Sequence, residues 1–346
     1  MDYKYKVTIV IPVYNAEKYI RKTLESALSQ TFANIEFLIL DDRGTDNSIG
    51  VIEELKQEHP RGKDIRIVSQ PKNMGVAQAR NRIIDEAQGK YLYFMDSDDV
   101  ISDNCISLLY SNILEHQAEV VFGSYEKVEL FKNDSKPIQY QYPNVCLFGD
   151  GKLAEFSYRC YGGVQASACN YLVSVDLLRK NNLKFINSRY WEDMVFTFEL
   201  VTHVSRAVML SDITYSYLCR DNSLSNYQVR NKIDKSEILN NVSTVDVLKR
   251  NTRNLLGKPY LGNRCYNIVM TDFYIICNVL KNKKIITPEI SDRELKSFLS
   301  HPLRLKEIVS LKGGVAKNLF LYTLSKLPVF AFIPIIKMIG RKKHLL

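Results

Sequence analysis

Several common sequence features are absent from this chain of 346 residues. Its seven cysteines contain no C-x-x-C pair, and such an odd, scattered set favours reduced thiols in a cytosolic compartment over a disulfide framework. The N-terminus passes directly into a strand-like pattern without a signal-type apolar run, so we do not expect secretion. The phosphate-loop pattern G-x-x-x-x-G-K-[ST], internal repeats and low-complexity tracts are also missing, which argues against P-loop and repeat proteins.

The charge balance is the first positive indication. Hydrophobic residues make up 46% of the chain and charged residues 25%, as in a globular protein, and the formal net charge is +9. A basic excess predicts an anionic partner such as a nucleotide, a nucleic acid or an anionic lipid. Because no RNA-type motif accompanies the basic residues, we do not expect a nucleic-acid partner.

Strand and helix signals alternate over the first 125 residues. Runs rich in β-branched residues predict strands, and the amphipathic patterns between them predict helices. The predicted strands are Val7–Val13, Ile35–Leu40, Ile65–Ser69, Tyr91–Met95 and Val120–Ser124, and the predicted helices are Ala16–Gln30, Ser48–His59, Gly75–Ala87 and Cys105–His116. This alternation predicts an α/β fold with a mostly parallel sheet flanked by helices.

Beyond Lys127 the regular alternation of strand and helix signals ends. The polar segment Phe131–Tyr142 is predicted to form a loop, and most of the chain after it is predicted to be helical. The predicted helices are Ala154–Tyr161, Val173–Asn181, Asp193–His203, Lys232–Leu256, Arg264–Leu280 and Asp292–Ser300. The last of them begins with a capping box, Ser291-x-x-Glu294. We therefore predict an α/β domain over residues 1–226, with halves 1–125 and 126–226, and a helical C-terminal region over residues 227–346.

The end of the chain is both basic and apolar. No Asp or Glu follows Glu307, while seven Lys and Arg residues lie between Lys312 and Lys343. The stretch Leu319–Ile336 is apolar but contains one lysine and two prolines, which is too broken for a spanning helix of roughly 20 apolar residues. We predict that residues 312–346 contact a membrane surface that contains anionic lipid. Packing on the protein's own core is the alternative.

Three carboxylates follow the predicted strand Tyr91–Met95, in the sequence Asp96-Ser97-Asp98-Asp99. In open α/β sheets ligands bind beyond the carboxyl ends of the strands. Hard divalent cations that accompany nucleotide phosphates are held by one or two carboxylates and by the phosphates themselves. Helix capping is the alternative, but Ser102 and Asp103 already offer a cap for the next helix. The cluster therefore predicts a metal and nucleotide site.

Three further polar clusters lie at the ends of predicted strands or the starts of helices. They are Pro12-Val13-Tyr14-Asn15, Asp41-Asp42, and the segment that contains Asn73, Gly75 and Arg80. An Asp after the second strand is able to accept the imide N–H of a uracil-like base or a ribose hydroxyl, and free N–H groups at a helix start suit an anion. The alternatives are helix capping, which Asp46 could provide alone, and a solvated arginine.

In this order, the motifs V-T-I-V-I-P-V-Y-N, L-I-L-D-D-x-x-T-D, N-x-G-x-A-x-A-R-N and D-S-D-D resemble those of the family 2 glycosyltransferases of GT-A fold. The resemblance is strong over about the first 125 residues. It continues more weakly in Trp191-Glu192-Asp193, which is similar to the family's catalytic ED motif, and in a Y-x-Y-x-x-R-x-x-S-x-S segment that contains Arg220. A helix start with acids on its dipole is the alternative for residues 191–193.

The resemblance implies an inverting enzyme that transfers a sugar from a nucleotide-diphosphate sugar, with UDP favoured. The acceptor would be a hydroxyl of a glycan or lipid-linked glycan, in surface-polysaccharide synthesis of the bacterial type. Such an enzyme would work in the cytoplasm, peripherally on the inner face of the cell membrane. A non-catalytic family member that binds sugars or nucleotides as a scaffold is the alternative, and the joint presence of Asp98, Asp99 and Asp193 argues against it.

The resemblance also implies roles for individual residues. Pro12, Val13 and Tyr14 would form the base pocket, and Asp42 or Asp41 would bind the uracil or ribose. Other members of the nucleotide-sugar site would be Asn15, Asn73, Gly75, Arg80, Asp96, Ser97 and Arg220. Asp98 would face the ribose and diphosphate, Asp99 would ligate Mn²⁺ or Mg²⁺ with Asp98 beside it, and Asp193 would be the general base with Glu192 as its neighbour.

Two positions depart from the family's pattern. Arg43-Gly44 replaces a G-S pair after Asp42, which puts a bulky cation in a normally small turn and is expected to alter the nucleotide pocket. Ala168-Cys169-Asn170-Tyr171-Leu172 replaces the family's W-N-K-L segment and is expected to alter how the donor sugar or acceptor is held. A G-x-G-x-x-A match at residues 149–154 follows the loop region rather than the first strand, so it does not predict a dinucleotide site.

Overall fold

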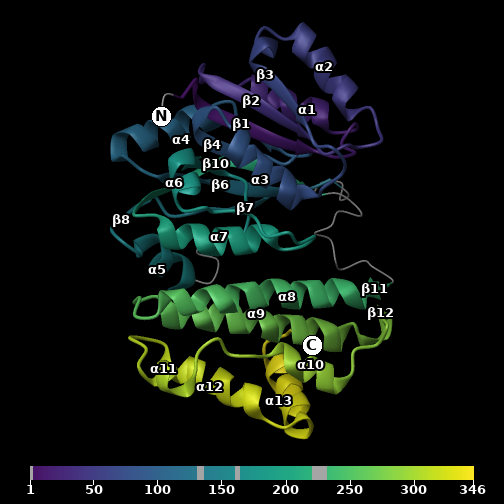
Figure 1. Ribbon diagram of the computed structural model, residues 1–346, viewed down its shortest axis with the longest axis vertical. Coiled ribbons are helices and arrows are strands. Elements are labelled where there is room, and N and C mark those ends of the chain that lie inside the picture. The colour runs from purple at the N-terminus through teal and green to yellow at the C-terminus, as the bar shows by residue number, and fades with distance from the viewer. Residues whose placement is uncertain (1–2, 131–135, 160–163, 220–231) are drawn as a thin grey trace. The chain divides into compact units, whose positions relative to one another are not determined.

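The computed structural model describes residues 3–130, 136–159, 164–219 and 232–346, and it divides the chain into two compact units (Figure 1). Unit 1 comprises Met1–Leu153, Gln165–Arg189 and Phe196–Asn226, and unit 2 comprises Ala154–Val164, Tyr190–Val195 and Tyr227–Leu346. Two helices, α5 (Lys152–Arg159) and α7 (Glu192–His203), contribute residues to both units.

Unit 1 is built on one mixed sheet, which has ten strands among the described residues. Its path is β3-β2-β1-β4-β9-β6-β10-β5, with β7 paired to β6 and β8 paired to β10. The strands are β1 (Tyr5–Val13), β2 (Ile35–Asp41), β3 (Ile65–Ser69), β4 (Gly89–Phe94), β5 (Val100–Ile101), β6 (Val120–Glu129), β7 (Ile138–Tyr140), β8 (Val145–Phe148), β9 (Tyr171–Ser174) and β10 (Arg206–Cys219). The helices that lie wholly in this unit are α1 (Ile20–Leu28), α2 (Ser48–Glu58), α3 (Val76–Glu86), α4 (Cys105–His116), α6 (Val175–Lys180) and the 3₁₀ turn η1 (Gly62–Asp64).

The first four strands in space are parallel, as the alternation of strand and helix signals predicts. β1 pairs in parallel with both β2 and β4, and β2 pairs in parallel with β3. All seven residues of β2 are buried, which explains its continuous apolar character. Gly89 allows β4 to approach β1 closely, because a Cβ at this position would lie 2.5 Å from the backbone nitrogen of Thr8. The carboxyl ends of β1, β2 and β4 therefore meet at one edge of the sheet.

The other half of the sheet differs from the expected pattern. β9 runs antiparallel between β4 and β6, so the sheet as a whole is mixed. Residues Val173 and Ser174, predicted to be helical, belong to β9, and the helix α6 starts only at Val175. The strand β10 was not predicted at all, because register shifts around Ile213 interrupt the regular alternation of its side chains. Part of the predicted loop Phe131–Tyr142 forms β7.

Unit 2 is mainly helical, as predicted. Its elements are α8 (Lys235–Thr252), α9 (Leu261–Lys281), α10 (Asp292–Phe298), α11 (Leu305–Val309), α12 (Val315–Lys326), α13 (Val329–Lys342), the 3₁₀ turns η3 (Arg253–Leu255) and η4 (Lys283–Ile285), and the short strands β11 (Ile233–Asp234) and β12 (Ile286–Thr287). A buried ion pair joins α8 to α9, with Lys249 Nζ 2.7 Å from Asp272 Oδ2. The predicted capping box of Ser291 and Glu294 is confirmed at the start of α10.

The basic C-terminal segment folds as α12 and α13. One face of these helices packs against α9 and α10, and it buries Leu321, Leu324, Phe332 and Ile336. The other face leaves large apolar side chains in solvent, among them Phe330, which is 82% exposed. Among the described residues, no helix is both long enough and apolar enough to cross a bilayer. The segment thus packs on its own unit, the alternative left open by the sequence, and still exposes an apolar face.

Candidate functional site

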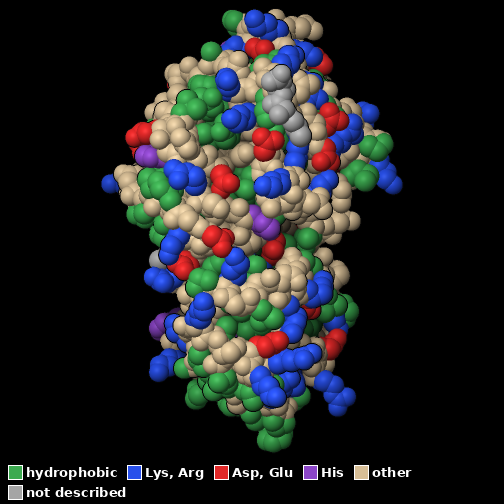
Figure 2. Space-filling model, turned by 60° about the vertical axis from the view of Figure 1, so that its left-hand side comes forward, with side chains coloured by type: hydrophobic (Ala, Val, Ile, Leu, Met, Phe, Trp, Pro, Cys, Tyr) green, Lys and Arg blue, Asp and Glu red, His purple; other side chains and the backbone are tan. Residues whose placement is uncertain are grey.

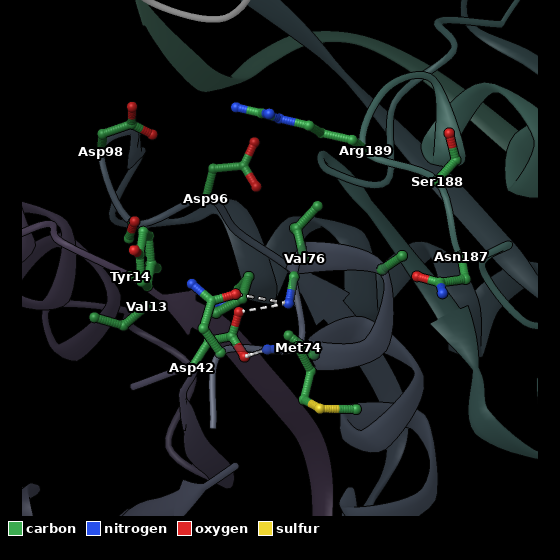
Figure 3. Close-up of a pocket in the computed structure, with 16 residues that line it drawn as sticks. Val13, Tyr14, Asp42, Met74, Val76, Asp96, Asp98, Asn187, Ser188 and Arg189 are labelled. Carbon is green, nitrogen blue, oxygen red and sulfur yellow. Dashed lines mark hydrogen bonds between the residues drawn. The ribbon is translucent and has the colours of Figure 1, made fainter. Parts of the chain in front are cut away.

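A pocket of about 650 Å³ lies where β1, β2 and β4 end, and all its lining residues belong to unit 1 (Figure 3). Most of the residues predicted for the nucleotide-sugar site contribute to it. The lining residues are Pro12, Val13, Tyr14, Asp42, Asn73, Met74, Gly75, Val76, Ala77, Ala79, Asp96, Ser97, Asp98, Asn187, Ser188 and Arg189. Residues of all four predicted clusters, which are distant in sequence, therefore come together at one edge of the sheet.

The pocket has two ends of different character. In the view of Figure 3, Asp96, Asp98 and Arg189 lie together in the upper part, and the Arg189 side chain extends toward the two carboxylates. Val13, Asp42 and Met74 lie in the lower part. One end therefore combines acids with a cation, which suits a metal-bound anion, while the other offers apolar surface beside one carboxylate.

Asp42 is anchored by backbone groups. It is 3% exposed, and its Oδ1 and Oδ2 accept hydrogen bonds from the backbone N–H groups of Met74 (2.8 Å) and Gly75 (2.9 Å). Gly75 has a φ of +83°, a region that glycine adopts readily, and it precedes the first turn of α3. Each carboxylate oxygen has a second lone pair, so Asp42 keeps the capacity to accept a bond from a ligand. The loop 73–75 and the end of β2 thus form one rigid wall.

Two predicted residues after β1 and β2 do not line the pocket. Asp41 is buried, and it accepts hydrogen bonds from the backbone N–H of Arg43 (2.8 Å) and from Ser69 Oγ (2.9 Å). Asn15 accepts a bond from the backbone N–H of Thr45 (2.7 Å). Both side chains therefore hold the loop after β2, and neither is among the lining residues.

Arg43, the first departure from the family's pattern, is held by residues at the end of β2 and just after β3. Its backbone has a φ of +59°, the left-handed region that glycine normally occupies in such turns. Its guanidinium donates to the carbonyl oxygen of Gln70 (2.7 Å) and lies 3.4 Å from Asp41 Oδ2. Arg43 is not among the lining residues, so the expected change in the nucleotide pocket does not arise from direct contact.

Asp96 is positioned by Arg80. The Arg80 Nη2 donates to Asp96 Oδ1 at 2.8 Å, and its guanidinium lies 5.5 Å from the centre of the Phe185 ring. Arg80 is buried and does not line the pocket, so the solvated arginine left open by the sequence is excluded. Its contact with the site runs through Asp96. The pair therefore fixes the position of the Asp96 carboxylate at the edge of the pocket.

Asp99 is placed differently from its neighbours. It is 1% exposed, its Oδ2 accepts a bond from the Tyr215 hydroxyl (2.6 Å), and its Oδ1 accepts one from the backbone N–H of Leu218 (2.8 Å). Burial and the nearby Asp96 carboxylate raise the pKa of Asp99 to about 7. Tyr215 also accepts a bond from the backbone N–H of Asp96 (3.3 Å). Asp99 thus ties the acidic loop to β10, and this geometry does not support the metal-ligand role expected for it.

The donor set at the pocket suits a shared metal site rather than a protein cage. The described residues contain no group of three or more His, Cys, Asp or Glu side chains placed to hold a metal ion. Asp96 and Asp98 nevertheless bring two carboxylates to one end of the pocket. Mg²⁺ and its hard relatives are commonly bound by one or two carboxylates together with substrate phosphates. These residues therefore fit Mn²⁺ or Mg²⁺ that arrives with a nucleotide diphosphate.

The sequence did not predict the pocket wall formed by Asn187, Ser188 and Arg189. This wall follows a segment that is fixed by Asn81, the last residue of the N-x-G-x-A-x-A-R-N motif. The backbone N–H of Phe185 donates to Asn81 Oδ1 (2.7 Å), and Asn81 Nδ2 donates to the Phe185 carbonyl oxygen (2.8 Å). The position of Arg189 just before Trp191-Glu192-Asp193 was the signal that could have pointed to it.

The two predicted catalytic residues are not among the residues that line the pocket. Glu192 and Asp193 begin α7 within the residues assigned to unit 2, and Asp193 Oδ1 accepts a bond from the backbone N–H of Met194 (2.7 Å). Their catalytic role stays a prediction. Arg220 lies outside the described residues.

Asn170, in the second departure from the family's pattern, is a structural residue. It is buried with a φ of +68°, and its Nδ2 donates to the carbonyl oxygens of Gly123 (2.6 Å) and Ser124 (3.1 Å). Its Oδ1 accepts a bond from Thr214 Oγ1 (2.7 Å). These bonds tie β6 to β10, and the segment contributes no side chain to the pocket.

The sequence matches known glycosyltransferases. Residues 8–163 match the family model described as glycosyl transferase family 2. Glycosyltransferase GlyG of Streptococcus pneumoniae serotype 4 is 29% identical over 222 residues, covering 63% of this chain and 72% of that protein. The cholesterol galactosyltransferase of Borreliella burgdorferi is 25% identical over 301 residues, covering 84% and 79%. The poly(ribitol-phosphate) beta-glucosyltransferase of Bacillus spizizenii is 27% identical over 219 residues, covering 62% of this chain but 32% of that protein.

Solved structures show the same fold. Residues 1–349 of S. aureus TarS superpose with a TM-score of 0.64 at 17% identity, covering 93% of this chain and 90% of that chain. The same TarS fragment in complex with UDP-GlcNAc gives a TM-score of 0.60 at 18% identity, with the same coverage. The mannosyltransferase PcManGT of Pyrobaculum calidifontis, in complex with GDP-Man and Mn²⁺, gives 0.50 at 13% identity, covering 94% and 89%. At these identities the likeness concerns the fold, and it confirms the expected GT-A class.

Proposed function

Because residues 8–163 match the glycosyl transferase family 2 model and named glycosyltransferases are similar to this chain, we propose that it is an inverting enzyme of this family that transfers a sugar from a nucleotide-diphosphate sugar to an acceptor hydroxyl. The pocket at the ends of β1, β2 and β4 is the donor site in this proposal. The observation that carries it is the grouping of Asp96, Asp98 and Arg189 at one end of a pocket whose other end offers Val13, Tyr14 and Asp42.

The two ends of the pocket suit the two parts of a nucleotide sugar. The Tyr14 side chain and the apolar surface beside it would hold the base, and Asp42 would accept a hydrogen bond from the base or the ribose. Arg189 would pair with the diphosphate, whose charge grows as the sugar leaves. We favour UDP because the TarS fragment of similar fold binds UDP-GlcNAc, and because a carboxylate at Asp42 suits the imide N–H of uracil.

Mn²⁺ or Mg²⁺ would be held by Asp98, with Asp96 beside it and the donor phosphates completing the shell. When bound, such an ion neutralises the developing charge of the leaving diphosphate, an effect worth several kcal/mol. Arg80 orients Asp96, and the hydroxyl of Tyr215 holds the loop through Asp99 and the backbone N–H of Asp96. We therefore assign the metal to Asp98 and give Asp99 a positioning role in place of the ligand role first expected.

Direct displacement with inversion needs a base that removes the proton of the acceptor hydroxyl. We propose Asp193 for this role, with Glu192 as its neighbour, because the Trp191-Glu192-Asp193 sequence matches the catalytic motif of the family. A positioned general base contributes about 10² to 10⁴ in rate. In this proposal residues 1–226 form the transferase domain, and residues 227–346 form an accessory helical region.

We also propose that the C-terminal helices bring the enzyme to a membrane surface. The apolar side chains Phe320, Phe330 and Met338 are exposed on α12 and α13, and Figure 2 shows hydrophobic side chains beside Lys and Arg side chains in this part of the molecule. A cavity of about 340 Å³ between α9, α12 and α13 has Lys317 and Lys343 in its otherwise largely apolar lining. Such a surface suits anionic headgroups above acyl chains. A lipid-linked glycan at the inner face of the membrane would then be the acceptor.

The direct test is nucleotide release from a panel of UDP-, GDP- and dTDP-sugars with Mn²⁺, Mg²⁺ or a chelator. We expect turnover from one UDP-sugar that requires the metal and is lost in Asp98→Asn. Absence of both turnover and nucleotide binding would overturn the donor-site proposal and favour the non-catalytic scaffold. Binding without turnover would direct the search to lipid-linked acceptors.

A further inference from the structure

Unit 2 contains a small cavity that the donor site does not use. It has a volume of about 140 Å³. Its lining residues lie on α8, on α9, in β11 and at the position just before α7. Its lining includes the aromatic side chains of Trp191 and Tyr274 and the amides of Asn241 and Asn278, and isoleucines complete the wall. Among the described residues, no Lys, Arg, Asp or Glu lines it. The cavity therefore suits a neutral ligand and does not suit a phosphate or a metal ion.

Asn241 supplies a buried polar atom without a partner. The residue is 6% exposed, and its Oδ1 is buried and accepts no hydrogen bond from the described residues. Buried carbonyl oxygens in native proteins are nearly always hydrogen-bonded, because leaving one without a donor is unfavourable. Asn278, also in the lining, uses its Oδ1 to accept a bond from Asn282 Nδ2 (2.9 Å), so its Nδ2 is the group with donor capacity left. One acceptor and one donor thus remain for a ligand hydroxyl.

Trp191 connects this cavity to the proposed base. It is the single tryptophan of the chain, and it directly precedes Glu192 and Asp193. Its φ is +61°, in the left-handed region that bulky side chains rarely adopt. Backbone strain of this kind persists where the surroundings fix it, and it gathers at functional sites. A group bound in the cavity would be held next to the residues that receive the acceptor's proton.

We propose that this cavity is an acceptor subsite that binds a neutral sugar ring of the glycan acceptor. The Trp191 and Tyr274 rings would cover an apolar face of the sugar, and Asn241 Oδ1 would accept a hydrogen bond from one sugar hydroxyl. Holding a neighbouring ring in this way would position the reacting hydroxyl for Asp193. This inference rests on the proposed glycosyl transfer and adds where the acceptor binds and what class of group is recognised.

Trp191 also provides the measurement, because its fluorescence reports on this cavity alone. The probes are the methyl glycosides of glucose, galactose, mannose and N-acetylglucosamine, titrated into the full chain with UDP and Mn²⁺ present. We expect at least one glycoside to give a saturable change in emission, and we expect Asn241→Leu to weaken its binding at least tenfold. Asn251→Leu, on the same helix but outside the cavity lining, is the matched control and should bind as the wild type does.

Two results would overturn the proposal. One is the absence of a saturable change with every glycoside, and the other is equal affinity for the wild type and Asn241→Leu. A second variant, Trp191→Phe, is measured by calorimetry. We expect it to bind the selected glycoside more weakly and to bind UDP as the wild type does, and the retained UDP binding shows that the variant is folded. UDP binding measured on the same samples separates the two proposals. If UDP binds and no glycoside does, the acceptor subsite fails alone, whereas loss of UDP binding in the wild type contradicts the donor site.

Discussion

The cavities of the two units differ in the side chains that line them. The pocket of unit 1 is lined by acids, an arginine and the backbone of a helix start, which are groups that bind metal ions and phosphates. The cavities of unit 2 are lined by aromatic, aliphatic and amide groups, with lysine only near the C-terminal helices. Charged side chains are therefore concentrated in the unit 1 pocket, where the charged diphosphate leaving group would bind.

This difference indicates that donor binding and acceptor recognition depend on different parts of the chain. The donor is the same kind of molecule for many transferases, and the strand ends that bind it carry recognisable motifs. The acceptor varies, and two relatives of this chain are named for cholesterol and for poly(ribitol-phosphate). The helical region is therefore where this chain would carry its own specificity. Four experiments test that division, beginning with the largest expected effect.

Asp193→Asn tests whether the chemistry draws on the residues assigned to unit 2. We expect kcat for transfer to fall by about 10² to 10⁴, because the acceptor hydroxyl loses its base. Calorimetric UDP binding should stay within a factor of two or so of the wild type, since Asp193 does not line the donor pocket. Activity close to that of the wild type would place the base elsewhere and leave the chemistry to unit 1 alone.

Asp99→Asn distinguishes the buried acid from the acids of the pocket. The folded-state pKa of Asp99 is raised to about 7 from an ordinary 3.8, so its stabilising contribution is present below about pH 4 and is lost as the pH rises through 7. The wild type should lose up to about 4 kcal/mol of unfolding free energy over this range relative to the variant. Denaturant unfolding at several pH values measures the difference. If the unfolding free energies of the wild type and Asp99→Asn changed with pH in the same way, the raised pKa of Asp99 would be contradicted.

Arg189→Ala tests the cation at the acidic end of the donor pocket. Charge-assisted hydrogen bonds of this kind are worth roughly 1.5–3 kcal/mol, so we expect kcat/KM for the donor to fall about ten- to a hundredfold. Arg189→Lys should recover part of the loss, because it keeps the charge but not the planar fork. Steady-state kinetics with the selected donor provides both values. Unchanged kinetics in Arg189→Ala would remove the diphosphate from this end of the pocket.

Replacing Lys317 and Lys343 together tests the surface of unit 2. Lys317→Glu with Lys343→Glu should weaken binding to phosphatidylglycerol vesicles by at least about thirtyfold, since each of the two lost cations contributes about 1 kcal/mol near an anionic surface. Donor hydrolysis in the absence of lipid should not change. Cosedimentation with vesicles measures the effect, and the pair Lys18→Glu with Lys22→Glu, both exposed in unit 1, provides the same change of charge elsewhere. Equal losses in both pairs would indicate general electrostatics rather than a lipid-binding face.

Much of the fold followed from the sequence because its signals were local. The strand Ile65–Ser69 and the helix Cys105–His116 were predicted to the residue, since apolar runs and amphipathic periodicity determine such elements. β9 and β10 were missed because they are defined by partners far away in sequence. Val173 pairs with Val120, and the irregular register of β10 follows β6. No local pattern carries that information.

The sequence motifs predicted where the site lies, but they did not predict which carboxylate of the Asp96–Asp99 motif faces the pocket. Asp98 and Asp99 are adjacent and chemically identical, so the sequence gives no reason to prefer one as ligand. The structure separates them, because the chain turns after Asp96, and the backbone N–H of Asp99 donates to the Asp96 carbonyl oxygen (3.3 Å). Asp96, Ser97 and Asp98 line the pocket, while the Asp99 side chain turns inward to Tyr215. Arg80 likewise proved to be a buried support for Asp96, a role that depends on the packing of Phe185.

The proposed donor site requires that Asp98, with Asp96 beside it, bind the metal together with the nucleotide. Calorimetric titration of UDP with and without Mn²⁺, on the wild type, Asp98→Asn and Asp99→Asn, tests it most directly. We predict that Mn²⁺ strengthens UDP binding to the wild type and to Asp99→Asn, and that this strengthening is lost in Asp98→Asn. Strengthening that survives in Asp98→Asn but disappears in Asp99→Asn would identify Asp99 as the metal ligand and contradict the assignment to Asp98.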